Sequence, residues 1–142
     1  MTDLKNIRIA GIDFGMKRTG IAVCDELHIT TTPLATLNTE SPDFFDNILK
    51  IFNEQRVKAV VVGIPYTMDG SKTDLIHEIE NFIEILKSKS GLNVYIIDES
   101  LTSIDAKNLM LTIGKKKSKR NEKGIVDKIA SALILRAFLD TL

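Results

Sequence analysis

Near the middle of the 142-residue chain stands Lys58-Ala59-Val60-Val61-Val62-Gly63-Ile64, which is apolar after its first residue. A run of this kind is typical of a β-strand buried on both faces, as in a parallel sheet covered by helices. Both flanking segments predict helices. Upstream, Ser41 and Pro42 supply an N-cap and a first-turn proline for a helix that runs to about Gln55. Downstream, residues 71–74 (Ser-Lys-Thr-Asp) resemble a capping box with Asp in place of Glu.

Outward from this centre, the pattern predicts a mixed sheet. The apolar run Val94–Asp98 predicts a second buried strand, and three β-rich segments near the N-terminus predict an antiparallel meander. We therefore expect an α/β fold with a mixed five-stranded sheet, three antiparallel meander strands then two parallel strands, flanked by helices on both sides. The other expected elements are strands Ile7–Asp13 and Gly20–Cys24, a strand from Ile29 that ends before Pro33 or resumes to Leu37, a short helix from Thr102 to about Leu111, a loop from Gly114 to Lys123, and a last helix from about Gly124 to Leu139.

The composition is that of an ordinary globular protein, with 44% hydrophobic and 27% charged residues. The length predicts one domain over residues 1–142. The single cysteine, Cys24, excludes an intramolecular disulfide and fits a reducing, cytoplasmic location. The N-terminus shows no signal peptide, and no apolar run reaches the ~20 residues of a membrane span. Nineteen basic and nineteen acidic residues cancel, so nucleic-acid binding must come from a local patch.

Acidic residues stand where strands end or a helix starts, at Asp13, at the pair Asp98-Glu99 and at Asp127. Carboxylates in such places are what a divalent-metal site for phosphoryl transfer needs. Each also has a structural explanation. Asp13 can be the shoulder of a hairpin with a positive φ at Gly15, and Asp127 can be a first-turn acid stabilised by the helix dipole. Strand alternation puts Asp98 and Glu99 on opposite faces, and the pattern does not say which of them faces a site.

The acids form one site if the strands that carry Asp13 and Glu99 are neighbours and the last helix packs across them. Asp127 shares a helical face with small or apolar residues, so this helix can approach a sheet closely. Oxygen ligands suit Mg²⁺ or Mn²⁺ rather than Zn²⁺, and the sequence has no Cys/His cluster. With two such ions ~4 Å apart, one activates the attacking water and the other stabilises the leaving oxygen. The residues on the Asp127 face are Ala130, Ser131, Ile134 and Phe138.

Basic residues offer phosphate contacts at two places. Lys17 and Arg18 lie in the expected turn beside Asp13. A second group, which we call the basic run, is either a solvated loop or a flexible arm that contacts phosphates close to Asp127. It contains no aromatic residue, so base stacking is not indicated. The basic run comprises Lys115, Lys116, Lys117, Lys119 and Arg120.

Residues 63–70, Gly-Ile-Pro-Tyr-Thr-Met-Asp-Gly, join the central strand to the next expected helix. In open α/β sheets, ligands bind beyond the C-terminal ends of strands. A turn-rich connection explains this composition equally well, so the sequence leaves both interpretations open.

Four segments, in order along nearly the whole chain, are Gly11-Ile12-Asp13-Phe14-Gly15-Met16-Lys17-Arg18-Thr19-Gly20-Ile21-Ala22, Gly63-Ile64-Pro65 with Met68-Asp69-Gly70, Asp98-Glu99-Ser100-Leu101-Thr102-Ser103 with Ala106, and Lys123-Gly124-Ile125-Val126-Asp127 with Ala130-Ser131-Ala132. Together they resemble the motifs of the YqgF/RuvX family of pre-16S rRNA nucleases. The resemblance implies an RNase H-like fold and a metal-dependent endonuclease that processes the 5′ end of pre-16S rRNA in ribosome biogenesis. It also implies that Asp13, Glu99 and Asp127 are the catalytic and metal-binding acids, which selects Glu99 over Asp98 by analogy.

The sequence departs from that family at Ser100, where the usual residue is Arg, so Lys17, Arg18 or the basic run would have to replace the missing cation. Two other functions stay open. RuvC-like Holliday-junction resolvases share the implied fold and a carboxylate site, and dimerisation would favour that function because a four-way DNA junction presents two symmetric cleavage points. The other is a ribosome- or nucleic-acid-associated binding module with little catalysis. We expect the small-subunit rRNA precursor and the ribosome as partners, structured DNA as the alternative, and a monomer or homodimer.

Overall fold

Residues 3–66, 73–99 and 122–142 are described by the computed structural model, and for 122–127 the description covers the backbone alone. Within these ranges, five strands form one sheet in the order β3-β2-β1-β4-β5. The β1–β2 and β2–β3 pairs are antiparallel, and the β1–β4 and β4–β5 pairs are parallel. The predicted mixed sheet is therefore confirmed. The elements are β1 (Arg8–Asp13), β2 (Arg18–Cys24), β3 (Thr31–Asn38), α1 (Phe44–Gln55), β4 (Val57–Ile64), α2 (Asp74–Ser90), β5 (Asn93–Asp98) and α4 (Glu122–Leu139).

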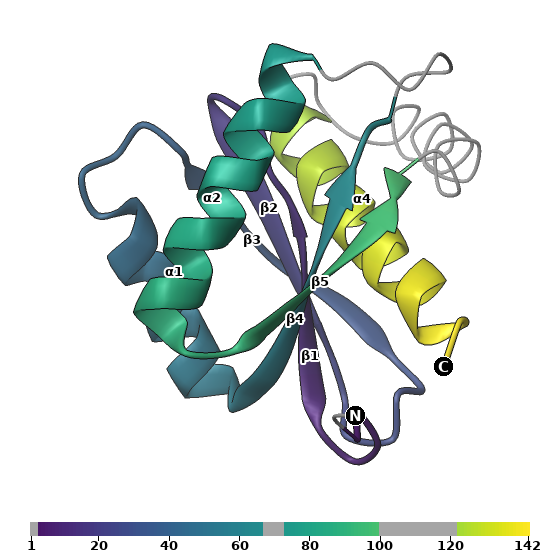
Figure 1. Cartoon of the computed structure of the whole chain (residues 1–142). Coiled ribbons are helices and arrows are strands. Elements are labelled where there is room, and N and C mark those ends of the chain that lie inside the picture. Colours follow the sequence, from purple (N-terminus) through teal and green to yellow (C-terminus); the bar gives the residue numbers. More distant parts are fainter. Residues whose placement is uncertain (1–2, 67–72, 100–121) are drawn as a thin grey trace.

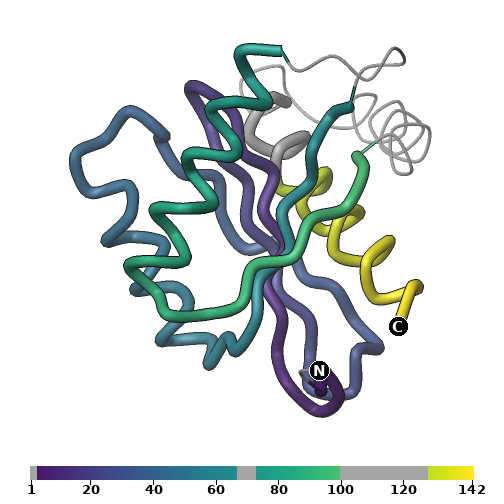
Figure 2. Tube along the Cα trace, in the orientation of Figure 1, coloured from purple at the N-terminus to yellow at the C-terminus, as the bar shows by residue number. Residues whose placement is uncertain are grey.

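The helices cover both faces of the sheet, as expected. Figure 1 shows α1 and α2 on one side and α4 on the other, and the traces in Figure 2 show the same arrangement. Each side has its own hydrophobic core, which we call the α1/α2 core and the α4 core. Residues of the central strand β4 lie in both cores, which explains why its run is apolar after Lys58. Val60 and Val62 lie in the α1/α2 core, whereas Ala59 and Val61 lie in the α4 core. In the part of the chain that is described, no helix combines the length and apolar character needed to cross a membrane.

Small residues on the strands let α4 lie very close to the sheet. A Cβ added at Gly11 of β1 would stand 2.7 Å from Leu135 Cβ and 2.7 Å from the Ser131 carbonyl oxygen. A Cβ added at Gly63 of β4 would stand 2.6 Å from Ile134 Cδ1. The expected close approach is confirmed, and glycines of the sheet make it possible together with the fully buried Ser131 of the helix.

Two helix starts differ from the sequence prediction. α1 begins at Phe44 rather than at Pro42, and its N-cap residue Asp43 makes no side-chain capping hydrogen bond. The Ser41 hydroxyl instead accepts from the Asp43 backbone N–H (3.3 Å), which holds a turn ahead of the helix. The cap of α2 is Thr73, whose Oγ1 accepts from the Ile76 N–H (3.2 Å); Ser71 of the expected capping box lies outside the described residues.

Other boundaries follow the sequence more closely. β3 runs through Pro33, which confirms the longer alternative; an edge strand tolerates a residue without an N–H, and a register irregularity between Ile21 and Ala22 lies beside it. α4 begins at Glu122, two residues earlier than expected, and residues 114–121 of the predicted loop lie outside the described residues. The helix expected from Thr102 lies outside the described residues.

Candidate metal-binding active site

Asp13 is the last residue of β1 and pairs with Gly20 of β2. Side chains of a strand alternate between the two faces of the sheet. Ile9 lies in the α4 core and Gly11 lies against α4, so Asp13 continues on the α4 face. Its side chain is half-buried. The structure therefore places one candidate carboxylate at the C-terminal edge of the sheet, on the side that α4 covers.

Glu99 follows directly after β5, and its geometry separates it from Asp98. The Tyr95 ring contacts the Phe138 ring of α4 (5.4 Å between centroids), and Ile97 lies in the α4 core, so alternation places Glu99 on that same face and Asp98 on the opposite one. A second observation agrees. A Cβ built at Gly63 would stand 3.6 Å from Glu99 Cγ, so this side chain lies over β4 on the α4 side.

The condition that the strands of Asp13 and Glu99 are neighbours is not met. The sheet places β4 between β1 and β5, so the two backbones are separated by two strand spacings, roughly 10 Å. Because Gly63 has no side chain, that of Glu99 can lie across β4 in the direction of β1. The two acids thus share one face and one edge without adjacent strands.

Asp127 belongs to α4, but its side chain is outside the described part of the chain. It precedes the buried Ser131 by four residues, about one helical turn. The Ser131 carbonyl oxygen lies against Gly11, and Figure 1 shows the N-terminal end of α4 at the same end of the sheet as the arrowheads of β4 and β5. The backbone of Asp127 is therefore on the side of the sheet that carries Asp13 and Glu99. Among the described residues alone, no group of three His, Cys, Asp or Glu side chains could hold a metal ion.

Lys17 and Arg18 are exposed at the same edge, in the turn after Asp13 and at the start of β2. Hydrogen bonds connect this turn and the start of β2 to Thr39, the residue that follows β3. The Thr39 N–H donates to the Lys17 carbonyl (3.0 Å), and the hydroxyls of Thr19 and Thr39 share a hydrogen bond (2.8 Å). The two cations are thus carried by an anchored backbone. Every member of the basic run, and Ser100, lies outside the described residues.

Gly15 has a different role from the one expected. Among the described glycines a positive φ occurs at Gly91 and not at Gly15. A Cβ at Gly15 would instead stand 2.5 Å from the Arg18 carbonyl oxygen. A close approach within the turn, rather than a left-handed backbone, therefore requires glycine beside Asp13.

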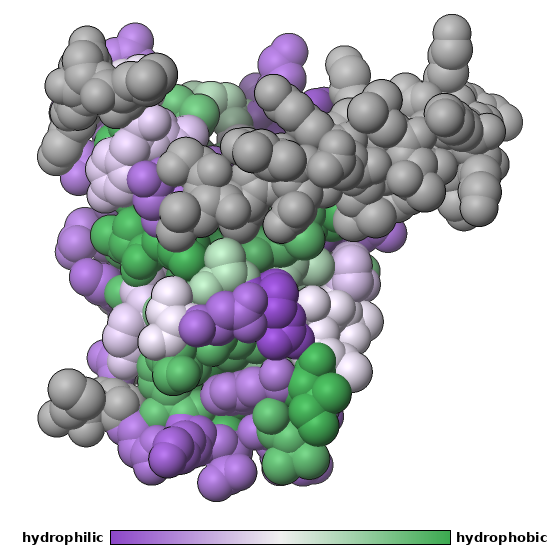
Figure 3. All heavy atoms as spheres, turned by 90° about the vertical axis from the view of Figure 1, so that its right-hand side faces the viewer, coloured by the Kyte–Doolittle hydropathy of each residue, from purple (hydrophilic) through white to green (hydrophobic). Residues whose placement is uncertain are grey.

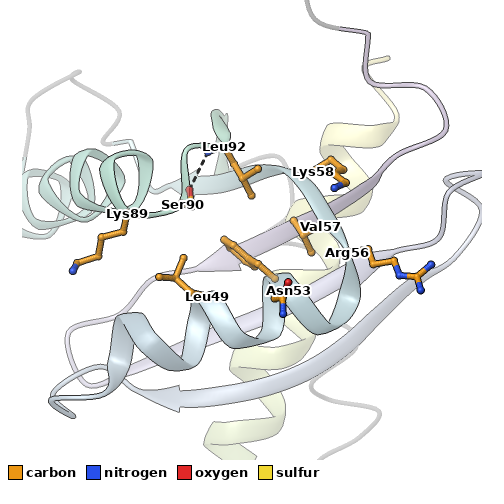
Figure 4. Close-up of a pocket in the computed structure, with 9 residues that line it drawn as sticks. Leu49, Asn53, Arg56, Val57, Lys58, Lys89, Ser90 and Leu92 are labelled. Atoms are coloured by element: carbon orange, nitrogen blue, oxygen red, sulfur yellow. Dashed lines mark hydrogen bonds between the residues drawn. The ribbon is translucent and has the colours of Figure 1, made fainter.

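A hollow of about 400 Å³ lies far from these acids, between the C-terminal ends of α1 and α2 and the start of β4 (Figure 4). Arg56, Lys58 and Lys89 stand around its apolar floor, which includes Leu49 and Phe52. Cations at helix C-termini offset the helix dipoles, so helix stability accounts for Arg56 and Lys89 without a ligand. On the part of the face in Figure 3 that the described residues form, hydrophilic residues lie between the hydrophobic patches. The carboxylate edge is therefore the better candidate site.

Comparisons with known proteins agree with this fold. The sequence profile of the RuvX family, described as Holliday junction resolvase, matches residues 7–141. A relative from Endomicrobium trichonymphae is 37% identical over 134 residues, covering 94% of this chain and 95% of its own length. A relative from Bacteroides fragilis is 38% identical over 136 residues, covering 94% and 96%. Both relatives carry the name "Putative pre-16S rRNA nuclease".

Solved structures show the same fold at low sequence identity. The RuvC of T. thermophilus in complex with a Holliday junction substrate aligns with a TM-score of 0.60 at 17% identity, covering 95% of both chains. The Holliday junction resolvase of fowlpox virus aligns with a TM-score of 0.55 at 15% identity, covering 96% of this chain and all of that one (100%). The predicted RNase H-like fold is confirmed. Because the profile spans nearly the whole sequence and the relatives match over most of both chains, this protein belongs to the RuvX family.

Proposed function

We propose that this chain is a divalent-metal-dependent endonuclease that hydrolyses a phosphodiester bond at the 5′ end of pre-16S rRNA, in the cytoplasm. The observation that carries the proposal is the position of Asp13 and Glu99 on one face of the sheet, at its C-terminal edge, with Glu99 lying over Gly63. The names of the two relatives support the RNA substrate. Membership of the RuvX family supports a hydrolytic nuclease.

The donor atoms at this edge fit a hard cation. Asp13 and Glu99 offer carboxylate oxygens, the ligands that Mg²⁺ and Mn²⁺ prefer. The thiol of Cys24, a soft donor, is buried in the α4 core and is unsuited to this role. We assign Asp127 as the third acid because its backbone precedes Ser131 by about one helical turn, and the Ser131 carbonyl oxygen lies against Gly11. A bound ion of this kind polarises the phosphodiester and activates a water molecule.

The remaining residues position the substrate. Lys17 and Arg18 would hold phosphates beside the acids, and the hydrogen bonds of Thr39 to their turn would keep these cations in place. The basic run would extend the contact along the RNA backbone and would replace the cation that Ser100 lacks. These contacts carry no base specificity, so they fit a substrate chosen by its shape or by a ribosomal partner.

A Holliday-junction resolvase is the second candidate. The description of the family profile favours it, and the two aligned structures have this fold. It differs from the first candidate in substrate, since the same carboxylate chemistry hydrolyses either backbone. A binding module with little catalysis is the third, and it predicts binding without cleavage.

One experiment separates these functions. Wild type, Asp13→Asn and Glu99→Gln are incubated with a precursor rRNA fragment and with a four-way DNA junction, with and without Mg²⁺ or Mn²⁺. Asp98→Asn is the matched control, because Asp98 adjoins Glu99 on the opposite face of the sheet. We expect metal-dependent RNA cleavage by wild type and by Asp98→Asn. In Asp13→Asn and Glu99→Gln the rate of RNA cleavage should fall by more than roughly 100-fold. That is the cost of losing a residue that only hydrogen-bonds to a metal ligand, and Asp13 and Glu99 are proposed as ligands themselves.

Junction cleavage without RNA cleavage would establish the resolvase instead. Binding of either substrate without cleavage would support the binding module. Equal cleavage by wild type and Asp13→Asn would contradict the assignment of the metal site. Circular dichroism of each variant separates loss of chemistry from loss of folding.

A further inference from the structure

Tyr66 is an exposed aromatic residue at the carboxylate edge. It follows β4, the strand that lies between those of Asp13 and Glu99, and stands three residues after Gly63. Its side chain is 47% exposed. Met16, in the turn directly after β1, is another large apolar side chain exposed at this edge (52%). The acids are thus bordered by apolar surface as well as by cations.

The backbone holds Tyr66 in place. Its N–H donates to the Ile64 carbonyl (3.1 Å), which closes a three-residue turn with Pro65 at the centre. The proline ring fixes φ near the value that an inverse γ-turn requires. An aromatic ring on such a turn loses little conformational freedom on binding a flat partner. This fixed attachment distinguishes Tyr66 from a side chain on a freely moving loop.

Among the described residues, the aromatic rings that pack on one another do not include that of Tyr66. Phe14, Phe44, Phe45 and Phe82 contact one another with centroid distances of 4.6–6.4 Å and form part of the α1/α2 core or pack against it. No ring contact joins Tyr66 to another aromatic residue within the described ranges. A single exposed tyrosine is ordinary on a protein surface, so exposure alone carries little weight. Its attachment at the strand end between the two acids makes it informative.

We infer that Tyr66 is a stacking platform for one unpaired nucleobase beside the scissile phosphate, which makes the preferred substrate single-stranded or locally unpaired RNA. The inference rests on the proposed function. The basic run contributes charge but no aromatic ring, so Tyr66 supplies the flat apolar contact that it lacks. A base inside a duplex already stacks on its neighbours and cannot reach the ring, whereas bases of single-stranded RNA can turn outward onto aromatic side chains.

Binding is the direct test, in an Asp13→Asn background that does not consume the substrate. The probe is a short single-stranded RNA with one 2-aminopurine, compared with the same strand in a duplex. Tyr66→Leu should raise the Kd for the single strand by about 5- to 150-fold, the range for loss of one base–aromatic stack. It should also abolish the quenching of 2-aminopurine fluorescence that binding to wild-type Tyr66 causes. Tyr66→Phe should preserve both, because stacking needs the ring and not the hydroxyl.

The matched control is Ile29→Ala, which removes an exposed apolar side chain (67% exposed) from the connection between β2 and β3, at the other end of the sheet. It should leave the Kd unchanged. An unaltered Kd and quenching in Tyr66→Leu would overturn the inference, as would an equal loss of affinity for the duplex or a complete absence of single-strand binding. Failure of wild type to cleave RNA would overturn the proposed function alone, because the stacking measurement does not depend on cleavage.

Discussion

The two faces of the sheet are packed in different ways. On the α1/α2 face, β-branched residues such as Ile12 and Val62 meet the aromatic rings of Phe44 and Phe82, and the layers are separated by bulky side chains. On the α4 face, the strands present Gly11, Gly63, Ala22 and Ala59, and the helix backbone comes close to the strands. Bulky side chains on the α1/α2 face supply buried apolar area. Small residues on the α4 face let α4, which carries Asp127, lie near the ends of β1 and β5. Substitutions on the first face should therefore affect mainly stability, and those on the second should affect activity as well.

The largest effect on stability should come from Phe82→Ala on the α1/α2 face. Phe82 is buried, and its ring stacks on that of Phe14 (4.6 Å between centroids). Truncation should lower the free energy of unfolding by about 3–5 kcal/mol, from lost transfer energy and the cavity left behind. Urea denaturation measures the loss. Cleavage per folded molecule at low temperature should stay close to wild type, and a loss of activity without a change in stability would contradict the division between the faces.

A smaller loss of stability but a larger loss of activity is expected for Gly11→Ala. The new Cβ would stand 2.7 Å from the backbone carbonyl oxygen of Ser131, so α4 must move. We expect a cost of about 1–3 kcal/mol, typical of overpacking, together with reduced metal-dependent cleavage.

Gly91→Ala is its control. Gly91 has φ +70° and no atom within 4 Å of its added Cβ, so the change strains the backbone without displacing a helix. It should lose stability, by about 1 kcal/mol or more, while keeping full activity per folded molecule. Equal activity in both glycine variants would show that the position of α4 does not matter for the site.

Thr19→Val should have a more modest effect, since it removes one partner of the 2.8 Å hydroxyl pair with Thr39. The loss should be about 0.5–1.5 kcal/mol, measured by thermal denaturation. Replacing both threonines with valine should recover part of it, because neither hydroxyl is then left without its partner. If the Lys17 turn positions phosphate, the KM should rise more than kcat falls; an unchanged KM would remove Lys17 and Arg18 from the proposed contact.

The smallest effect concerns Cys24 in the α4 core. Burial raises the pKa of its thiol, partly offset by the Ile9 N–H that donates to Sγ. The pKa of the thiol in the unfolded chain is about 8.5, so above that pH the unfolded chain loses its proton first. The free energy of unfolding should therefore fall as the pH rises through this range, until the folded thiol also titrates. Cys24→Ala should show a flatter slope, and identical slopes would contradict this coupling.

The sequence predicted the sheet because its signals are local. Alternating apolar residues and apolar runs of a few residues identify strands. In β4 the apolar residues point to both faces, which identifies a strand in the middle of the sheet. The predicted start of α1 was wrong. Ser41 is a good N-cap residue by type, but its hydroxyl accepts a hydrogen bond in the turn that precedes the helix. Such competition among short polar side chains depends on the local backbone geometry, which a residue pattern does not contain.

The candidate site was predicted in part, for a related physical reason. Asp13 and Glu99 are visible as acids at strand ends, but Glu99 and Asp98 become distinguishable only when the face of each is known. The requirement for neighbouring strands overlooked the fact that a glycine in the intervening strand lets a side chain cross it. Tyr66 lies in residues 63–70, which the sequence explains equally well as a ligand site or as a turn-rich connection. Its exposure and fixed turn depend on the folded chain, so no sequence signal identifies that side chain.

Pro33 also limits how copies of this chain can associate. It lies within β3, an edge strand of the sheet, and a register irregularity in β2 lies beside it. A border strand offers its free N–H and C=O groups to any other extended chain, and this is a common start of aggregation. A residue without an N–H interrupts the row of donors that a docking strand would need. The same proline that left two possible lengths for β3 in the sequence thus gives this strand one backbone donor fewer.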